Sequence, residues 1–352
     1  MTAQTQSSRR LPITRRVLDQ MSPHRWFAGL CDRTPPVPAY MFHQPVPDLF
    51  TSMAQAVRRS QCAAVTTDDV LDRAGSLNPD RSIWLTFDDG WSSVWSVAFP
   101  IAKRHSLRFT AFICPELIEE SDECRTTIES GLEPDEARQR DLGPRSRLTW
   151  GELRQMSQSG LVDVQSHSLH HGLVFRSPDA QVSRRDVELV LRSGLPILQQ
   201  SGGRDVLLRR AEAQDVRHPL GPALAVERRY LEASADAEGR WESDEERRRR
   251  FCDDLSGARR MLESRLSTRV RALAPPWALM HRDLPAVAAE TGHELLVMGF
   301  PFTPLPAAPI PVHPRLKGDA VWFAISSRMT APARWLVSMS NSRRLASAGG
   351  VP

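Results

Sequence analysis

The stretch SIWLTFDDGWSSVW, residues 82–95, decides the fold. Its apolar run at residues 83–85 predicts a strand that enters the core, and this strand ends in two adjacent carboxylates, Asp88 and Asp89. The end of a strand is partly buried, and like charges that are adjacent repel each other there. The pair therefore indicates either a site that supplies positive charge or, less informatively, the N-cap of a following helix.

Strand-like and helix-like segments alternate on both sides of this stretch. Further strands are predicted at residues 38–42, 108–114, 161–166, 270–275 and 294–300. Helices are predicted at residues 48–60, 96–105, 149–160, 245–266 and 283–292. Thr149 and Glu152 form a capping box at the start of the third helix, and Gly160 suits its end. Strands that alternate with helices imply parallel pairing and an α/β fold.

Two charged segments, residues 119–146 and 176–243, are too long to be ordinary loops. We expect both to be insertions, partly helical, near the mouth of a barrel. A small separate domain is an alternative for the second. The domain itself is expected to span residues 35–330, between an N-terminal arm (1–34) and a C-terminal tail (331–352).

A second polar cluster, LVDVQSHSLHHG, ends the strand predicted at 161–166. His167 and His171 are four residues apart, so on a tight helical turn they would share one face. Two imidazoles and one carboxylate suit a divalent metal with an open position for water. The metal would offset the charge of one of the two aspartates, and the other would be free to act as a base. A polar loop with a structural histidine is the alternative for His170 and His171 alone.

Three short motifs lie in this order along the chain: TFDDG (86–90), SHSLHH (166–171) and APPW (274–277). They resemble the first three motifs of the carbohydrate esterase 4 family, the polysaccharide deacetylases with NodB homology. PAYMFHQP (38–45) and IPVHPRLKGDAVWF (310–323) resemble segments of the subgroup that acts on poly-N-acetylglucosamine.

This resemblance implies a distorted (β/α)7-type barrel, the NodB-homology fold, with its site at the C-terminal ends of the strands. The implied reaction is hydrolysis of an N-acetyl group on a sugar. By motif position, Asp88 is the implied catalytic base, and the backbone N–H of Trp277, after Pro276, is the implied donor to the oxyanion. One divalent ion, zinc first, with manganese, cobalt, nickel or iron as alternatives, would have three ligands: Asp89, His167 and His171.

The chain departs from the family pattern in three ways. Ala274 stands where many members carry an arginine that orients the catalytic aspartate, and Ala278 replaces the usual glycine. No L-x-x-H motif is present to supply the usual acid histidine. The resemblance implies that His43, after Phe42 at the family's tyrosine position, is the acid instead. His313 is a second candidate, and a buried structural histidine is the alternative for His43.

Two tryptophans are candidates for substrate binding. Trp91 and Trp277, the latter beside Pro276, could stack on the C–H face of a pyranose, although packing in the core or at its rim is the alternative. The leading interpretation is a metal-dependent hydrolase that removes an N-acyl group from an amino sugar or glycan precursor. The alternatives are a related hydrolase of a cyclic amide or ureide, and a non-catalytic glycan-binding relative.

Composition bounds the partners and the compartment. The 352 residues carry a formal charge of +4, and no basic stripe interleaved with aromatic residues indicates nucleic-acid binding. No stretch is long and apolar enough to span a bilayer, and the paired arginines at the N-terminus precede no apolar signal region. The five cysteines show no CxxC spacing, which favours reduced thiols. We therefore expect a cytoplasmic enzyme whose substrate is a carbohydrate or amino sugar; the oligomeric state is left open.

Overall fold

The computed structural model describes residues 37–73, 75–78, 81–176, 195–198, 220–231, 238–299 and 308–318. The predicted N-terminal arm and C-terminal tail lie outside the described residues. Much of the second predicted insertion lies outside them as well.

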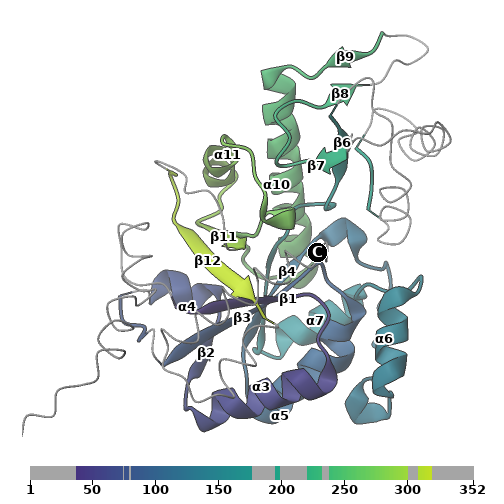
Figure 1. Ribbon diagram of the computed structural model, residues 1–352, viewed down its shortest axis with the longest axis vertical. Helices are drawn as coiled ribbons and strands as arrows, with labels where there is room; N and C mark the ends of the chain where they lie inside the picture. The colour runs from purple at the N-terminus through teal and green to yellow at the C-terminus, as the bar shows by residue number, and fades with distance from the viewer. Residues whose placement is uncertain are drawn as a thin grey trace, which may run out of the picture.

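The centre of the protein is a ring of seven parallel strands (Figure 1). In ring order they are β1 (Ala39–Phe42), β12 (Val312–Lys317), β11 (Leu295–Gly299), β10 (Ala272–Leu273), β5 (Val162–Ser166), β4 (Phe109–Ile113) and β3 (Ser82–Asp88). The ring closes because the later residues of β3 pair with β1, while its first residues pair with the short strand β2 (Ala63–Val65). The predicted seven-stranded α/β barrel is therefore confirmed.

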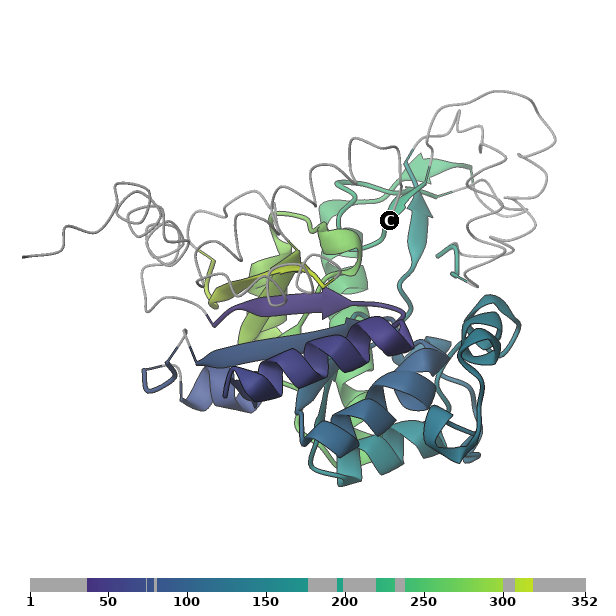
Figure 2. The ribbon, with the colours of Figure 1, turned by 60° about the horizontal axis from the view of Figure 1, so that its bottom comes forward.

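Helices cover the outside of the ring (Figures 1 and 2). The α-helices are α3 (Pro47–Arg59), α4 (Thr67–Asp72), α5 (Phe99–His105), α6 (Pro134–Leu142), α7 (Trp150–Gln158), α10 (Asp244–Leu266) and α11 (Leu284–Glu290). Shorter turns are the π-helix η1 (Val94–Ala98) and the 3₁₀ segments η2 (Pro115–Leu117), η3 (Ile128–Ser130) and η4 (Pro276–Ala278). The capping box of α7 is confirmed, since Glu152 N–H donates to Thr149 Oγ1 at 3.1 Å. The helix predicted at 96–105 differs, because its first turns are the π-helix.

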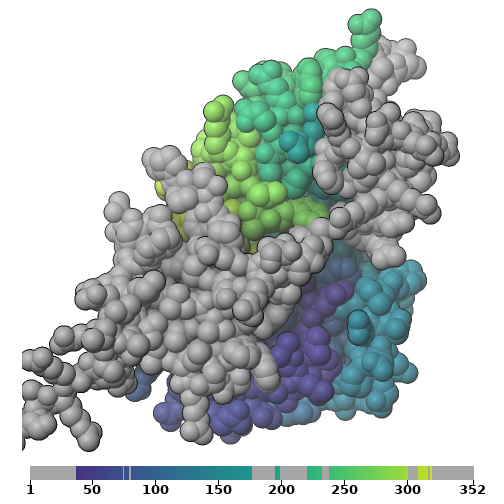
Figure 3. All heavy atoms as spheres, in the orientation of Figure 1, coloured from purple at the N-terminus to yellow at the C-terminus, as the bar shows by residue number. Residues whose placement is uncertain are grey.

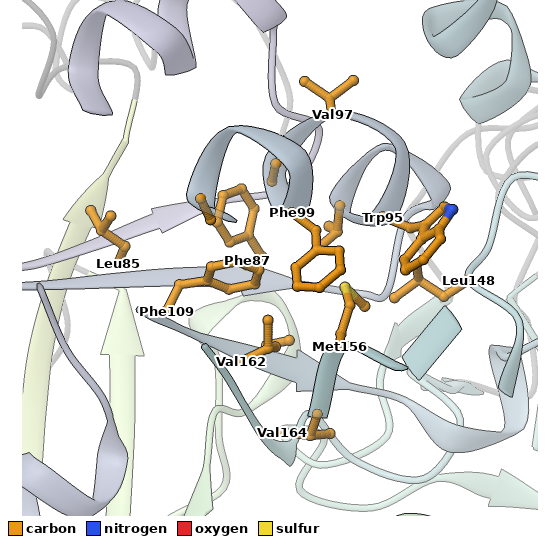
Figure 4. Packing of buried hydrophobic residues seen from close by; sticks show 14 of the residues in the cluster. Leu85, Phe87, Trp95, Val97, Phe99, Phe109, Leu148, Met156, Val162 and Val164 are labelled. Carbon is orange, nitrogen blue, oxygen red and sulfur yellow. The ribbon is translucent and has the colours of Figure 1, made fainter. Parts of the chain in front are cut away.

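The side chains of β3 alternate between the layer under the outer helices and the inside of the ring. Leu85 and Phe87 face outward and pack with Phe99 of α5 and Phe109 of β4, as Figure 4 shows. Trp84 belongs to a different cluster, inside the ring, with residues of β4, β10 and β11. Because successive side chains of a strand point to opposite faces, Asp88 follows Trp84 into the ring and lies at its C-terminal end.

The barrel interior below Asp88 is polar and hydrogen-bonded. Trp84 Nε1 donates to Thr110 Oγ1 at 2.9 Å, and this hydroxyl donates to Asp163 Oδ2 at 3.0 Å. Burial raises the pKa of Asp163 even though it accepts these hydrogen bonds and others. The polar side chains inside the barrel, below the site, therefore have hydrogen-bond partners.

The first insertion is fixed to the barrel by buried charge. Arg125 donates to both carboxylate oxygens of Glu152 on α7, at 2.7 Å each, and Glu152 is fully buried. Asp141, near the end of α6, accepts hydrogen bonds from Ser92 Oγ and Ser93 N–H, directly after the TFDDGW stretch. The prediction that this insertion is partly helical is borne out by α6, and the insertion supports the loop that follows the two aspartates.

Two short antiparallel strand pairs lie at the start of the second insertion and within its described part. Strand β6 (Leu173–Phe175) pairs with β7 (Leu220–Pro222), and β8 (Tyr230–Leu231) pairs with β9 (Arg240–Trp241). These strands and α10 form the upper, green part of the face in Figure 3. Strands as short as two or three residues leave no readable periodicity, so the sequence did not predict them.

Candidate active site

Asp88 is held by an arginine that the sequence analysis did not identify. Arg315, on β12, donates from Nη1 to Asp88 Oδ1 at 2.6 Å and from Nη2 to Oδ2 at 2.5 Å. Both side chains are almost completely buried. Arg315 Nη1 also donates to Thr86 Oγ1 at 3.0 Å, one layer below. The guanidinium that is missing at Ala274 is therefore supplied from another strand.

Asp89 turns away from Asp88 because its backbone has a φ of 70°, and Gly90 continues the turn with a φ of 71°. Its Oδ2 accepts a hydrogen bond from Trp91 Nε1 at 3.1 Å. Its Oδ1 is buried, has no hydrogen-bond partner among the described residues, and lies 3.2 Å from His167 Nε2 and 3.4 Å from His171 Nε2. Burial opposes its charge, but the nearby histidines outweigh burial and hold the pKa of Asp89 well below its usual range.

The Nε2 atoms of the two histidines both face Asp89 Oδ1. His167 Nδ1 lies 2.6 Å from the carbonyl oxygen of Ala274, to which only an N–H can be donated, so the neutral ring has its lone pair on Nε2. Burial lowers the pKa of His171 to about 4, so this ring is neutral near pH 7. His167 thus has the second partner that usually fixes a metal-binding histidine, whereas His171 Nδ1 has no hydrogen-bond partner among the described residues.

The loop between them is not the tight helical turn that the spacing suggested. Ser168 has a φ of 73° and His171 a φ of 53°, both in the left-handed region. Two hydrogen bonds support this conformation: His171 N–H donates to Ser168 Oγ at 2.9 Å, and Leu169 N–H donates to the buried Asp254 of α10 at 2.9 Å. The two rings do converge as predicted, but a loop held by these hydrogen bonds brings them together rather than a helical turn.

These three side chains form a group that could hold a metal ion. One donor atom from each of Asp89, His167 and His171 lies within 4.8 Å of the others. A buried carboxylate oxygen without a hydrogen bond, facing two imidazole nitrogens, fits the donor set of zinc and similar divalent ions. His170 points elsewhere, since its Nδ1 lies 2.9 Å from Glu116 Oε2 and its Nε2 lies 3.4 Å from Asp254 Oδ2.

The two candidate acids, His43 and His313, lie in different surroundings. His43 lies just after β1 with a side chain that is 45% exposed, and its Nε2 is 4.0 Å from Asp89 Oδ2. It is therefore a residue of the site's rim rather than a buried core histidine. His313 is buried in the barrel with its ring 5.0 Å from that of Trp84, and burial lowers its pKa to about 4. Trp84 precedes Asp88 by four strand residues, roughly 13 Å along β3.

The third motif borders the same site. Trp277 (φ 62°) and Ala278 (φ 54°) both adopt left-handed conformations after the buried Pro276. The Trp277 ring meets the His171 ring in a T-shaped contact with 5.1 Å between centroids. Trp277 therefore packs beside a candidate ligand.

Trp91 has contacts that its sequence position did not reveal. The guanidinium of Arg147 lies 3.9 Å from the centre of its ring and covers one face. Arg147 also donates to the carbonyl oxygen of Asp89 at 3.2 Å. Trp91 and Arg147 thus hold Asp89 from both its side chain and its backbone, and at most one face of the Trp91 ring is open to a substrate.

The parallel barrel thus brings an acidic pair and two histidines together at the C-terminal ends of its strands. The family model described as polysaccharide deacetylase matches residues 76–208, which include Asp88, Asp89, His167 and His171. The predicted resemblance to the polysaccharide deacetylases is thereby confirmed, and so is the predicted enzyme class, a hydrolase of carbon–nitrogen bonds other than peptide bonds. A search of the curated proteins finds no match.

Solved structures of similar fold carry related names. The deacetylase domain of BpsB from Bordetella bronchiseptica is 23% identical (TM-score 0.52), covering 79% of this chain and 95% of that domain. A de-N-acetylase from Aggregatibacter actinomycetemcomitans is 16% identical (TM-score 0.52; 80% and 93% covered). IcaB from Ammonifex degensii is 17% identical (TM-score 0.50; 83% and 96% covered).

In the described part of this chain, no helix combines the length and apolarity needed to cross a membrane.

Proposed function

We propose that this protein removes N-acetyl groups from the amino sugars of a glycan or glycan precursor. One observation carries the proposal: Asp89 Oδ1 and the Nε2 atoms of His167 and His171 converge beside an aspartate, Asp88, that is held by Arg315. The polysaccharide deacetylase family and the neighbouring structures named as deacetylases support the same reaction.

One divalent ion, zinc first and manganese, cobalt, nickel or iron as alternatives, would be held by Asp89, His167 and His171. When bound, such an ion polarises the amide carbonyl and promotes the ionisation of water. Trp91, Arg147 and the Ala274 carbonyl hold the donor atoms in place before the ion arrives. This preorganisation limits the cost of ordering the ligands.

Asp88 is the proposed base. Each of its oxygens accepts one hydrogen bond from Arg315, which leaves a second lone pair on each oxygen to accept a proton from the attacking water. Asp88 Oδ2 lies 3.9 Å from His167 Nε2, so the base borders the ligand group. Arg315 supplies the opposite charge and fixes the orientation of the carboxylate.

His43 is the proposed acid that protonates the leaving amine. Its Nε2 lies 4.0 Å from Asp89 Oδ2, and its exposed side chain can reach a bound substrate. The backbone N–H of Trp277 is the proposed donor to the developing oxyanion, as in related enzymes. Pro276 and the rings of Trp91 and Trp277 would border the sugar.

The test is acetate release. The zinc-loaded protein is incubated with N-acetylated sugars and, separately, with cyclic imides and ureides, and acetate and ring opening are measured. We expect acetate from the sugars alone. Ring opening without acetate release would refute the proposal in favour of a different carbon–nitrogen hydrolase. The cytoplasmic location stays a prediction, to be checked by fractionation of the cells that produce the protein.

A further inference from the structure

Asp254, a buried acid on α10, faces the loop that joins the two candidate histidine ligands. It is 3% exposed, and burial raises its pKa. A buried carboxylate is unfavourable unless it is hydrogen-bonded. Asp254 Oδ1 accepts a hydrogen bond from Leu169 N–H at 2.9 Å, and its Oδ2 lies 3.4 Å from His170 Nε2. Both of these partners belong to the loop, so the buried acid acts on the loop.

Leu169, in the middle of this loop, is held from three sides. Its N–H donates to Asp254, and its carbonyl oxygen accepts a hydrogen bond from Glu116 N–H at 3.1 Å. Its side chain lies against Gly257, one turn further along α10, where an added Cβ would come within 3.0 Å of Leu169 Cδ2. The glycine therefore lets α10 approach the loop closely enough for Asp254 to reach the backbone.

The loop needs such an anchor because its backbone is strained. Ser168 and His171, on either side of Leu169 and His170, both have left-handed conformations, with φ of 73° and 53°. Residues other than glycine keep such conformations only where the surrounding structure holds them. The bond from His171 N–H to Ser168 Oγ lies within the loop, so it cannot fix the loop relative to the barrel. The contacts of Leu169 with α10 and η2 do fix it.

The His171 ring depends on this loop more than the His167 ring does. His167 Nδ1 lies 2.6 Å from the Ala274 carbonyl oxygen, and this bond orients the ring. His171 Nδ1 has no hydrogen-bond partner in the part of the chain that the structure describes, and its ring contacts that of Trp277. Histidines that bind a metal usually have a second hydrogen-bond partner that orients them. For His171, the backbone of the loop takes over this task.

We propose that Asp254 is a positioning residue for His171, because it holds the loop so that the His171 ring faces Asp89 before a metal ion binds. This inference rests on the proposed function, whose metal group includes His171. Asp254 acts through the amide of Leu169 and does not touch the donor atoms. It also lies outside residues 76–208, which the family model matches, so α10 contributes to the site from beyond that segment.

The first experiment measures the zinc affinity of the metal-free protein by competition with a chromophoric chelator. Asp254→Ala should weaken zinc binding about 10- to 100-fold, the usual loss when a residue that orients a ligand is removed. Asp254→Asn should bind zinc within about threefold of the wild type, because its amide oxygen can still accept the Leu169 N–H. Asp253→Ala, which removes the exposed neighbouring acid on the same helix, is the matched control and should bind zinc like the wild type.

Two further measurements separate positioning from a merely structural role. The visible absorption of the cobalt-loaded protein reports on the arrangement of the ligands, and Asp254→Ala should change it whereas Asp253→Ala should not. Hydrogen exchange of the metal-free protein should be faster at residues 167–171 in Asp254→Ala than in Asp254→Asn or the wild type. If Asp254→Ala does not fold, Asp254→Ser replaces it, since its hydroxyl oxygen lies one bond nearer the backbone, and the same losses are expected.

An unchanged zinc affinity and cobalt spectrum in Asp254→Ala, even with a lower Tm, would overturn the proposal. An Asp254→Asn variant that binds zinc as weakly as Asp254→Ala would overturn it as well, because the hydrogen bond would then not be the cause. A wild type that binds neither zinc nor cobalt would show instead that the proposed metal group has failed. Hydrogen exchange then decides the anchor alone: faster exchange in Asp254→Ala supports it, and unchanged exchange overturns it.

Discussion

Replacing Arg315 by alanine should destabilise the protein and abolish most of its activity. The Arg315–Asp88 pair is almost completely buried and doubly hydrogen-bonded, so the substitution leaves Asp88 as a buried charge without a partner. Breaking such a pair costs about 3–5 kcal/mol. At roughly 2 °C per kcal/mol, suited to a large domain, Tm should fall by about 6–10 °C. Freed from its guanidinium, Asp88 should also lose its orientation, and kcat should fall by about 100-fold or more.

The assay is urea unfolding followed by circular dichroism, with acetate release measured on the same preparations. Arg315→Ala combined with Asp88→Asn should be less destabilised than Arg315→Ala alone, because the double variant no longer buries a charge. Arg250→Ala is the matched control, because it breaks another buried pair, with Glu242, away from the metal group. It should lower stability and leave kcat for acetate release unchanged.

Unfolding of Arg315→Ala within about 1 kcal/mol of the wild type, with kcat retained, would refute the reasoning. A double variant that is less stable than the single one would refute it as well. Either result would mean that Asp88 finds another partner, such as ordered water, when the guanidinium is removed.

Four further predictions concern the histidines and the aspartates. His171→Ala should lose bound zinc by elemental analysis, and equal metal content in the variant and the wild type would exclude it as a ligand. Asp88→Asn should retain zinc and lose turnover, whereas Asp89→Asn should lose zinc as well; the reverse pattern would exchange their roles. His43→Ala should lower kcat by about 10²–10⁴ with metal content and Tm unchanged, whereas a structural role predicts a lower Tm and full activity of the folded fraction. Because burial lowers the pKa of His313 to about 4, its neutral form contributes stability that is complete above the unfolded pKa of about 6.5 and is lost as the pH falls toward 4. His313→Gln should therefore flatten the acid limb of the stability profile, and an unchanged limb would contradict this.

The sequence predicted the elements whose patterns are local and strong. The strand that ends at Asp88 and the helix predicted at 245–266, which is α10, were both correctly placed, because each buries apolar side chains along many residues. The motif positions also brought Asp88, Asp89, His167 and His171 to one end of the barrel, since parallel strands share their C-terminal edge.

The sequence did not reveal partners that only the closed ring brings together. Arg315 is 227 residues from Asp88, and no periodicity links the two. The absence of an arginine at Ala274 was visible, but its replacement depends on β12 lying beside β1 in the ring. The signal that could have identified it was the resemblance of the PR pair at Pro314 and Arg315 to a family strand. The turn at His167 to His171 was likewise unpredictable, because Asp254 of α10 pins it from a distant helix.

The two adjacent aspartates are compatible because one peptide unit turns their carboxylates to different partners. Strand alternation sends Asp88 inward to the guanidinium of Arg315, and the φ of 70° at Asp89 turns its carboxylate toward His167 and His171. Burial lowers the pKa of His171 to about 4, and in the neutral ring of His167 the Nδ1–H bond to Ala274 leaves the Nε2 lone pair facing the same oxygen. A buried carboxylate oxygen without a hydrogen-bond partner, such as Asp89 Oδ1, is unfavourable unless it gains a donor or a cation. The side-chain geometry at Asp89 therefore supports the divalent ion proposed there, and Arg315 gives Asp88 a partner of its own.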